Sequence, residues 1–402
     1  MFKSLNLKII VFGFIFTFFS SFGQSFFLGI FNSSIRNELL ISHGQFGTIY
    51  ALATLASSFL LIWVGKKIDD INISRFALLV ILLLSFSCFF FSRISSLGIL
   101  FISIFLMRFS GQGMMSHTAT TTISRYFTKS RGKALSSGWF GLSTAEFFLP
   151  VLMIYLLTIT DWRNIWIAIS IITIVFLPLI SYVLVKNINF DSREATEGEE
   201  FKEKNIKQWK RAEVVKDFRF YIICSNMLAM PWIATGTFVY QSFILSSKNW
   251  GPYVIAQSFM AYSVLSVITL FISGFLIDKF TSRRLLIYMN IPLLIAVFVI
   301  FYFNNPISSF VFLGLIGISN GFANVLGSST WAEIYGVKYI GSIKALTTAL
   351  MVFSTAFGTA LFGILIDSGF SIEQISIVSG LYISISLFSL LLIRKRLNPV
   401  VV

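Results

Sequence analysis

Long apolar stretches recur along the whole chain, and they constrain its fold more than any other feature. Each is close to the ~20 residues that an α-helix needs to cross a hydrocarbon core of about 30 Å, whereas transmembrane strands are about half as long and alternate in polarity. We therefore expect an all-α membrane protein with twelve transmembrane helices. We number them as spans one to twelve: 8–31, 46–64, 76–92, 97–123, 134–159, 164–185, 220–246, 253–275, 285–303, 309–332, 345–366 and 374–393.

The first stretch resembles a signal peptide in its basic start and apolar run, but no small-residue cleavage site follows it. We interpret it as a retained first span.

Basic residues are distributed unevenly between the two sides of the expected membrane. The chain carries 31 Lys and Arg against 17 Asp and Glu, a net charge of +14, which in a soluble protein would suggest nucleic acid. With the central loop left out, we count nineteen basic residues on the side of the termini and four opposite: Arg36, Arg93, Arg163 and Lys248. Because Lys and Arg are enriched in the short loops on the cytoplasmic side, we expect both termini there, in a cytoplasmic (inner) membrane, and no nucleic-acid partner.

One long polar connection, 187–216, divides the chain into halves 1–186 and 217–402. It holds seven acidic and seven basic residues and is locally neutral. A docking site is one interpretation of this loop. We favour a solvated cytoplasmic linker with a short surface helix.

The two halves share sequence features at matching positions, which indicates an internal repeat. The end of span two carries Gly65, Asp69 and Arg75, and the end of span eight repeats these residue types 209 positions later, at Gly274, Asp278 and Arg284. Gln24-Ser25-Phe26 recurs as Gln241-Ser242-Phe243. We infer two homologous six-helix halves.

The duplicated Gly-x-x-x-Asp pattern with a later Arg resembles the cytoplasmic signature of the major facilitator superfamily. Arg108 with Gly111-Gln112-Gly113 in span four resembles its second signature. This resemblance implies two pseudo-symmetric six-helix bundles, a site near the midplane lined by spans one, four, seven and ten, and transport by alternating access.

Three segments resemble a narrower group, the bacterial permeases related to the monocarboxylate and oxalate/formate carriers. They are SSFGQSFF at 20–27, SRYFTKSRGKAL at 124–135 and WAEIYGVKYIGSIKAL at 331–346. Span five lacks the Gly-Pro pair of the drug/proton antiporters, which makes multidrug efflux a weaker interpretation.

Arg108 in span four and Glu146 in span five are the two clearly ionisable acid or base side chains deep inside spans. Such groups are costly in a bilayer and by default indicate a cavity or a pathway. Their depths differ by only about 3 Å at a rise of about 1.5 Å per residue, so an ion pair between them is one alternative. The other has Arg108 binding a substrate carboxylate and Glu146 carrying a proton or competing for Arg108.

Polar side chains on other spans extend this candidate site. Gln112 shares the helix face of Arg108, whereas His117 points away, and we expect a packing or hydrogen-bonding role for it. Asn320 and Asn324 form a polar stripe on span ten, where substrate binding and helix packing are both open. The repeat-related positions Gln24, Thr237 and Gln241 are expected to contact substrate as well.

The duplicated charged clusters are expected to act as gates. The resemblance places Arg125 beside the first cluster and Glu333 beside the second, where opposite charges can hold the two halves together in one conformation. Exposed pairs are each worth about 0.2 to 1 kcal/mol, so several together can bias a conformational equilibrium.

No phosphate loop, HExxH motif, Gly-x-Ser-x-Gly elbow or Cys/His cluster occurs. We expect no enzyme activity, no cofactor and no metal, and buried thiols at Cys88 and Cys224.

The leading hypothesis is a monomeric secondary transporter of a small organic anion, with a proton or a counter-substrate as its partner. Alternatives are a carrier of a neutral or amphiphilic solute, efflux included, and a transporter-like sensor that moves nothing.

Overall fold

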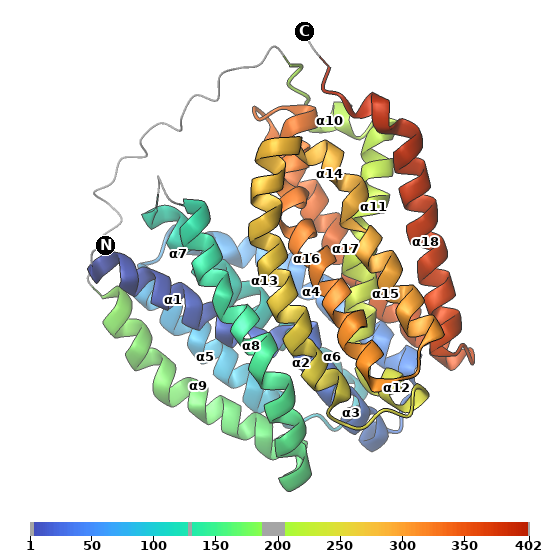
Figure 1. Ribbon diagram of the computed structural model, residues 1–402. Coiled ribbons are helices and arrows are strands. Elements are labelled where there is room, and N and C mark those ends of the chain that lie inside the picture. The colour runs from blue at the N-terminus through green and yellow to red at the C-terminus, as the bar shows by residue number, and fades with distance from the viewer. Residues whose placement is uncertain (1–3, 128–130, 187–205, 401–402) are drawn as a thin grey trace. The chain divides into compact units, whose positions relative to one another are not determined.

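The computed structural model describes residues 4–127, 131–186 and 206–400, almost all of them helical (Figure 1). In this part of the chain eleven helices are long and apolar enough to cross a membrane, and a bent pair, Leu7–Gly23 with Ser25–Leu39, makes a twelfth when counted as one span. The expected twelve-helix fold is therefore confirmed.

Residues cluster into two compact units, Met1–Gly198 and Glu199–Val402. In the first unit, span one comprises α1 (Ser4–Ser20), η1 (Ser21–Gly23), α2 (Ser25–Leu28), η2 (Gly29–Phe31) and α3 (Asn32–Leu39). Spans two to six follow as α4 (His43–Val64) with η3 (Gly65–Ile68), α5 (Ile73–Phe91), α6 (Leu97–Met107) with η4 (Arg108–Met115) and α7 (Ser116–Tyr126), α8 (Arg131–Ile159), and α9 (Trp162–Val185).

The second unit begins its helices with the short α10 (Arg211–Val214). Span seven comprises α11 (Phe218–Val239) and α12 (Gln241–Ser247). Spans eight to twelve are α13 (Val254–Phe280), α14 (Ser282–Met289) with α15 (Ile291–Tyr302), α16 (Pro306–Tyr335), α17 (Ile340–Asp367), and α18 (Ile372–Ile393) with η5 (Arg394–Leu397). We call the end of each unit at which span one or seven begins its proximal end, and the opposite end its distal end.

The same pairs of helices pack together in both units. Span one lies along span five, two along four, and three along six. In the second unit seven lies along eleven, eight along ten, and nine along twelve. This correspondence supports the repeat inferred from the sequence.

Apolar side chains cover the outsides of the helices and also pack between them, and small or hydroxyl-bearing residues lie at some of the contacts between helices. Leu179 and Phe275 are 68% and 77% exposed, which suits lipid, whereas Ser85 and Ser170 exchange buried hydrogen bonds between α5 and α9. Small and hydroxyl-bearing residues at helix contacts are typical of membrane proteins.

Side-chain caps fix the distal starts of several helices. Ser42 with Gln45 forms a capping box at α4, and Ser371 with Gln374 forms another at α18. Asp161 accepts the Arg163 N–H at the start of α9. These caps satisfy backbone N–H groups that have no partner within the helix.

The described end of the central connection packs against the second unit. The Lys207 N–H donates to the Val400 carbonyl at 2.8 Å, and the Trp209 N–H donates to the Tyr335 carbonyl at 3.0 Å. Arg219 forms an ion pair with Asp217 at 2.7 Å at the same proximal end. Residues 187–205, which belong to the expected linker, lie outside the described residues.

Candidate functional site

Arg108 lies at the start of the π-helical stretch η4, and only 2% of the residue is exposed. Its Nη1 donates to the Gly23 carbonyl at 3.1 Å and to the Ser25 hydroxyl at 3.2 Å. The guanidinium carbon lies 5.5 Å from the centre of the Tyr50 ring, and the Tyr50 hydroxyl also donates to Ser25, at 3.1 Å. Arg108 is therefore directed toward the break in span one.

Two facing glycines bring this break against span four. A Cβ atom on Gly23 would lie 2.3 Å from the Met107 carbonyl oxygen and 2.5 Å from the Gln112 nitrogen. A Cβ on Gly111 would lie 2.7 Å from the Gly23 nitrogen. Only glycine at both positions permits this backbone contact, which places the half-buried Gln24 and Gln112 beside Arg108.

Backbone irregularity accompanies the site in both crossing spans. Gln24 has extended dihedral angles, φ −83° and ψ 153°, and so interrupts span one between η1 and α2. In span four the helix widens to π geometry over Arg108–Met115, a feature that is frequent at functional sites.

The charge of Arg108 has no counter-ion in the described part of the chain. None of the ion pairs found there includes Arg108, and its buried Nε has no acceptor. Burying a charge without an opposite charge is costly, and removing one partner of a buried pair typically costs about 3–5 kcal/mol. Carbonyl, hydroxyl and ring contacts offset part of this cost only.

Glu146 lies in α8 and is 8% exposed. The ion pair with Arg108 that depth alone allowed is absent, because Arg108 is directed toward span one instead. Among the described residues, no hydrogen bond or ion pair of the Glu146 carboxyl is found.

Span ten of the second unit holds the expected asparagine stripe in a mainly packing environment. Asn320 Nδ2 donates to the Ser266 hydroxyl of α13 at 2.9 Å. Next to it, Gly317 and Gly321 let α16 approach the α13 backbone, since a Cβ at Gly317 would lie 2.3 Å from the Tyr262 carbonyl. Asn324 is exposed. The contact of Asn320 is the one that the packing alternative predicts.

Thr237 and Gln241 flank the break in span seven and are both buried. Gln241 Nε2 donates to the Phe238 carbonyl at 3.0 Å. Tyr240, at the break, donates its hydroxyl to the Thr359 carbonyl of α17 at 3.0 Å. Gln241, the position repeat-related to Gln24, thus also lies at a helix break.

At the proximal end of the first unit, Arg125 forms an ion pair with Asp69 and donates to the Ile68 carbonyl at 3.1 Å. His117 Nε2 lies 3.0 Å from the Gly65 carbonyl oxygen, the hydrogen-bonding role expected for it. Arg75 is exposed and takes part in none of the ion pairs found among residues 4–127, 131–186 and 206–400.

The matching cluster of the second unit is built around Glu333. Its carboxylate accepts the N–H groups of Ser282 and Arg283 at 2.8 and 3.2 Å, and so caps α14, where an anion also suits the helix dipole. Glu333 Oε1 pairs with Arg283 Nε at 3.0 Å, whereas the expected Arg284 is exposed. A Cβ at Gly274 would meet nothing within 4 Å, and nothing is described of the Asp278 side chain.

Sequence reasoning missed three contributors to these sites. Ser25 belongs to the repeated Gln-Ser-Phe motif, which is a sequence signal that could have identified it. Tyr50 carries no signal beyond its aromatic character. The repeat offset selects Arg284 and gives no signal for its neighbour Arg283. The described residues hold no group of three or more His, Cys, Asp or Glu that suits a metal ion.

Comparison with known proteins identifies the fold. The family model described as Major Facilitator Superfamily matches residues 13–359. A bacterial homologue of the human lysosomal transporter Spinster, in an inward-facing and unoccupied conformation, superposes with a TM-score of 0.75 at 13% identity, covering 98% of each chain. The nucleoside transporter NupG gives a TM-score of 0.71 at 13% identity, covering 98% of this chain and 99% of its own.

No curated protein matches the chain. The structural likenesses extend over the whole fold, and at 13% identity they carry no information on substrate. Because the family model covers most of the sequence, the chain belongs to the Major Facilitator Superfamily of membrane transporters.

Proposed function

We propose that this protein is a secondary transporter that moves a small organic anion, a carboxylate, across the cytoplasmic membrane by alternating access. The observation that carries the proposal is the buried guanidinium of Arg108, which has no anionic partner in the described chain and a free Nε–H. A carboxylate would supply the missing charge and accept that hydrogen bond.

The surroundings of Arg108 suit a ligand with several oxygen atoms. A guanidinium presents its N–H groups in a planar fork that matches a carboxylate, and it stays charged when buried. Half-buried amides at Gln24 and Gln112 lie at the same crossing and offer donors and acceptors to the rest of a small molecule. Thr237, Gln241, Asn320 and Asn324 remain proposed contacts from the second unit.

Coupling and gating complete the proposal. We assign proton transfer to Glu146, whose buried carboxyl has no partner among the described residues. We assign gating to the two proximal clusters, one built on Asp69 with Arg125 and the other on Glu333. The ion pairs within each unit supply charges that rearrange during the cycle and so bias the conformational equilibrium.

Ligand binding to the purified protein tests the anion directly. A panel of small carboxylates, each with its uncharged amide as a matched control, is added while the apparent melting temperature is followed, since a ligand of the folded state raises it. We expect at least one carboxylate to stabilise the wild type, its amide to do nothing, and Arg108→Gln to weaken binding by about 30-fold or more.

Two further variants separate the charge of Arg108 from its hydrogen-bonding geometry and provide a control. Arg108→Lys keeps the charge and loses the fork, so it should retain part of the affinity. Lys67→Gln removes an exposed cation at the proximal end and should change nothing. Unchanged carboxylate affinity in folded Arg108→Gln would overturn the proposal.

A neutral or amphiphilic solute is the second candidate, and the contacts of Arg108 with Gly23 and Ser25 favour it. In that case Arg108 stabilises the break in span one and touches no substrate. Arg108→Gln would then lower the melting temperature of the free protein and leave solute affinity unchanged. Failure of reconstituted protein to move any bound solute would favour a sensor.

A further inference from the structure

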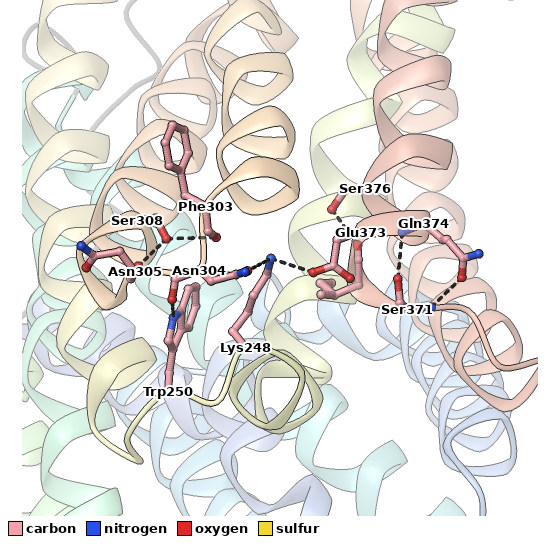
Figure 2. A network of polar contacts seen from close by, with 11 residues as sticks. Lys248, Trp250, Phe303, Asn304, Asn305, Ser308, Ser371, Glu373, Gln374 and Ser376 are labelled. Carbon is pink, nitrogen blue, oxygen red and sulfur yellow. Dashed lines mark hydrogen bonds and ion pairs between the residues drawn. The ribbon is translucent and has the colours of Figure 1, made fainter.

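A lysine at the distal end of the second unit is buried in a polar network (Figure 2). Lys248 follows α12, and 1% of its side chain is exposed. Its Nζ lies 2.7 Å from Glu373 Oε1, in the first turn of α18, and donates to Asn304 Oδ1 at 2.7 Å. Trp250 Nε1 donates to the Asn304 carbonyl at 2.6 Å. The end of span seven is thus tied to span twelve and to the connection between spans nine and ten.

The first unit contains a similar network at its own distal end. Glu38, in the last turn of α3, pairs with Arg163 in the first turn of α9. Arg163 also donates to the Ile94 carbonyl, between α5 and α6, and Trp162 Nε1 donates to Glu38 at 3.2 Å. The end of span one is thus tied to span six and to the connection between spans three and four.

The two networks occupy equivalent positions of the repeat. An offset of 210 residues separates Glu38 from Lys248, Arg163 from Glu373, and Ile94 from Asn304. The charges are reversed: the end of span one carries the anion and its partner the cation, whereas the end of span seven carries the cation. The loop residue supplies an oxygen acceptor to the cation in one unit through its backbone and in the other through its side chain.

We propose that these networks are a pair of distal clamps of opposite polarity, which fix the end of α3 to α9 and the end of α12 to α18. Both segments follow a break, at Gln24 in span one and at Tyr240 in span seven, where a helix can bend. A clamp at the far end suppresses such bending. The distal parts of spans one and seven therefore move with their units, and bending of α3 or α12 requires release of a clamp.

Burial predicts which clamp partner matters more. Lys248 is almost fully buried while 36% of the Glu373 side chain is exposed, so Glu373→Gln strands a cation away from water, whereas Lys248→Gln leaves a carboxylate that water can reach. Arg163 and Glu38 are 27% and 46% exposed, so breaking the first clamp should have the smaller effect.

Hydrogen–deuterium exchange of the intact, lipid-reconstituted protein tests the proposal without an attached probe. We expect the amides of α12 to exchange about tenfold faster in Glu373→Gln, less so in Lys248→Gln, while the interior of α13 stays unchanged. Glu38→Gln should accelerate exchange of α3 in the same way but more weakly. Lys67→Gln, which removes an exposed pair with Asp70 elsewhere, is the matched control and should affect neither segment.

Reversed polarity supplies the decisive variant. Lys248→Glu alone places two carboxylates together and should release α12, whereas Lys248→Glu combined with Glu373→Arg reproduces the first unit's arrangement and should restore slow exchange. An α12 that exchanges equally slowly in wild type and Lys248→Glu, or a double variant no slower than Lys248→Glu, would overturn the proposal. If Lys248→Glu fails to fold, the exchange rate of α12 in the double variant is compared instead with the rates in Lys248→Gln and Glu373→Gln, and it should again be the slowest of the three.

Discussion

At the scale of single residues, the first unit holds two buried ionisable groups that do not neutralise each other. Arg108 is satisfied in part by a carbonyl, a hydroxyl and an aromatic ring, and Glu146 has no partner among the described residues. A transporter that binds an anion and carries a proton needs both groups to be available. Their separation in this conformation is therefore consistent with the proposed function.

Glu146→Gln tests the coupling role. With the carboxyl removed, we expect substrate uptake to lose its dependence on a pH gradient, while exchange of substrate between the two sides continues. Uptake into proteoliposomes, with and without an imposed gradient, measures this. Asp70→Asn, at an exposed carboxylate, is the control, and a gradient dependence that survives in Glu146→Gln would remove the residue from this role.

The sequence indicated that these two residues lie deep inside spans, where the structure buries both, but it did not indicate their contacts. An isolated charge stands out in an apolar span, and its cost in a bilayer means that it is kept there only for a pathway or a polar contact. The partner of that charge depends on how each helix is rotated about its axis, and similar depth says nothing about rotation. Arg108 contacts span one because Gly23 and Gly111 bring spans one and four together, and this backbone contact is visible only in the packed structure.

At the scale of elements, spans one and four cross so closely that their backbones touch. The break at Gln24 and the widened turn η4 lie at this crossing, and Gly23 and Gly111 make it sterically permissible. The positions of the spans and their division into two six-helix halves followed from the hydrophobic pattern and the repeat. The irregular turns did not, because they are set by contacts between helices that no local pattern records.

Gly23→Ala and Gly111→Ala should each destabilise the protein by about 1–3 kcal/mol, since an added Cβ would overlap backbone atoms that cannot move aside independently. The apparent melting temperature in detergent measures this, and carboxylate-induced stabilisation should fall with it. Gly98→Ala is the matched control: nothing lies within 4 Å of its added Cβ, and alanine favours the helix by about 1 kcal/mol. Equal melting temperatures for all three variants would contradict the crossing.

At the scale of the whole molecule, charge distribution and fold support each other. With the central connection left out, the expected topology has nineteen basic residues on the side of the termini and four on the other. Three of those four have polar partners at the distal ends. Arg163 and Lys248 form the ion pairs of the two clamps, and Arg36 Nε donates to Asn32 Oδ1 at 2.7 Å.

Reporter fusions test the resulting orientation. A fluorescent protein that folds only in the cytoplasm should be bright when fused after residue 402, and alkaline phosphatase, active only outside, should be active when fused after Ser95 and inactive after Asp70. Activities on the opposite sides would overturn the expected topology. Inactive fusions at every position would indicate misinsertion, which expression of the full-length tagged chain distinguishes.

Each distal clamp closes within its own half, and this has a consequence for how the chain can change over evolutionary time. A substitution in one clamp can be compensated by a second substitution in the same half, with no matching change in the other. Opposite polarity at Glu38 and Lys248 is the outcome expected when two copies of an ancestral six-helix unit drift independently at such a position. Related chains should therefore show either polarity in either half, with the two members of a clamp always changing together.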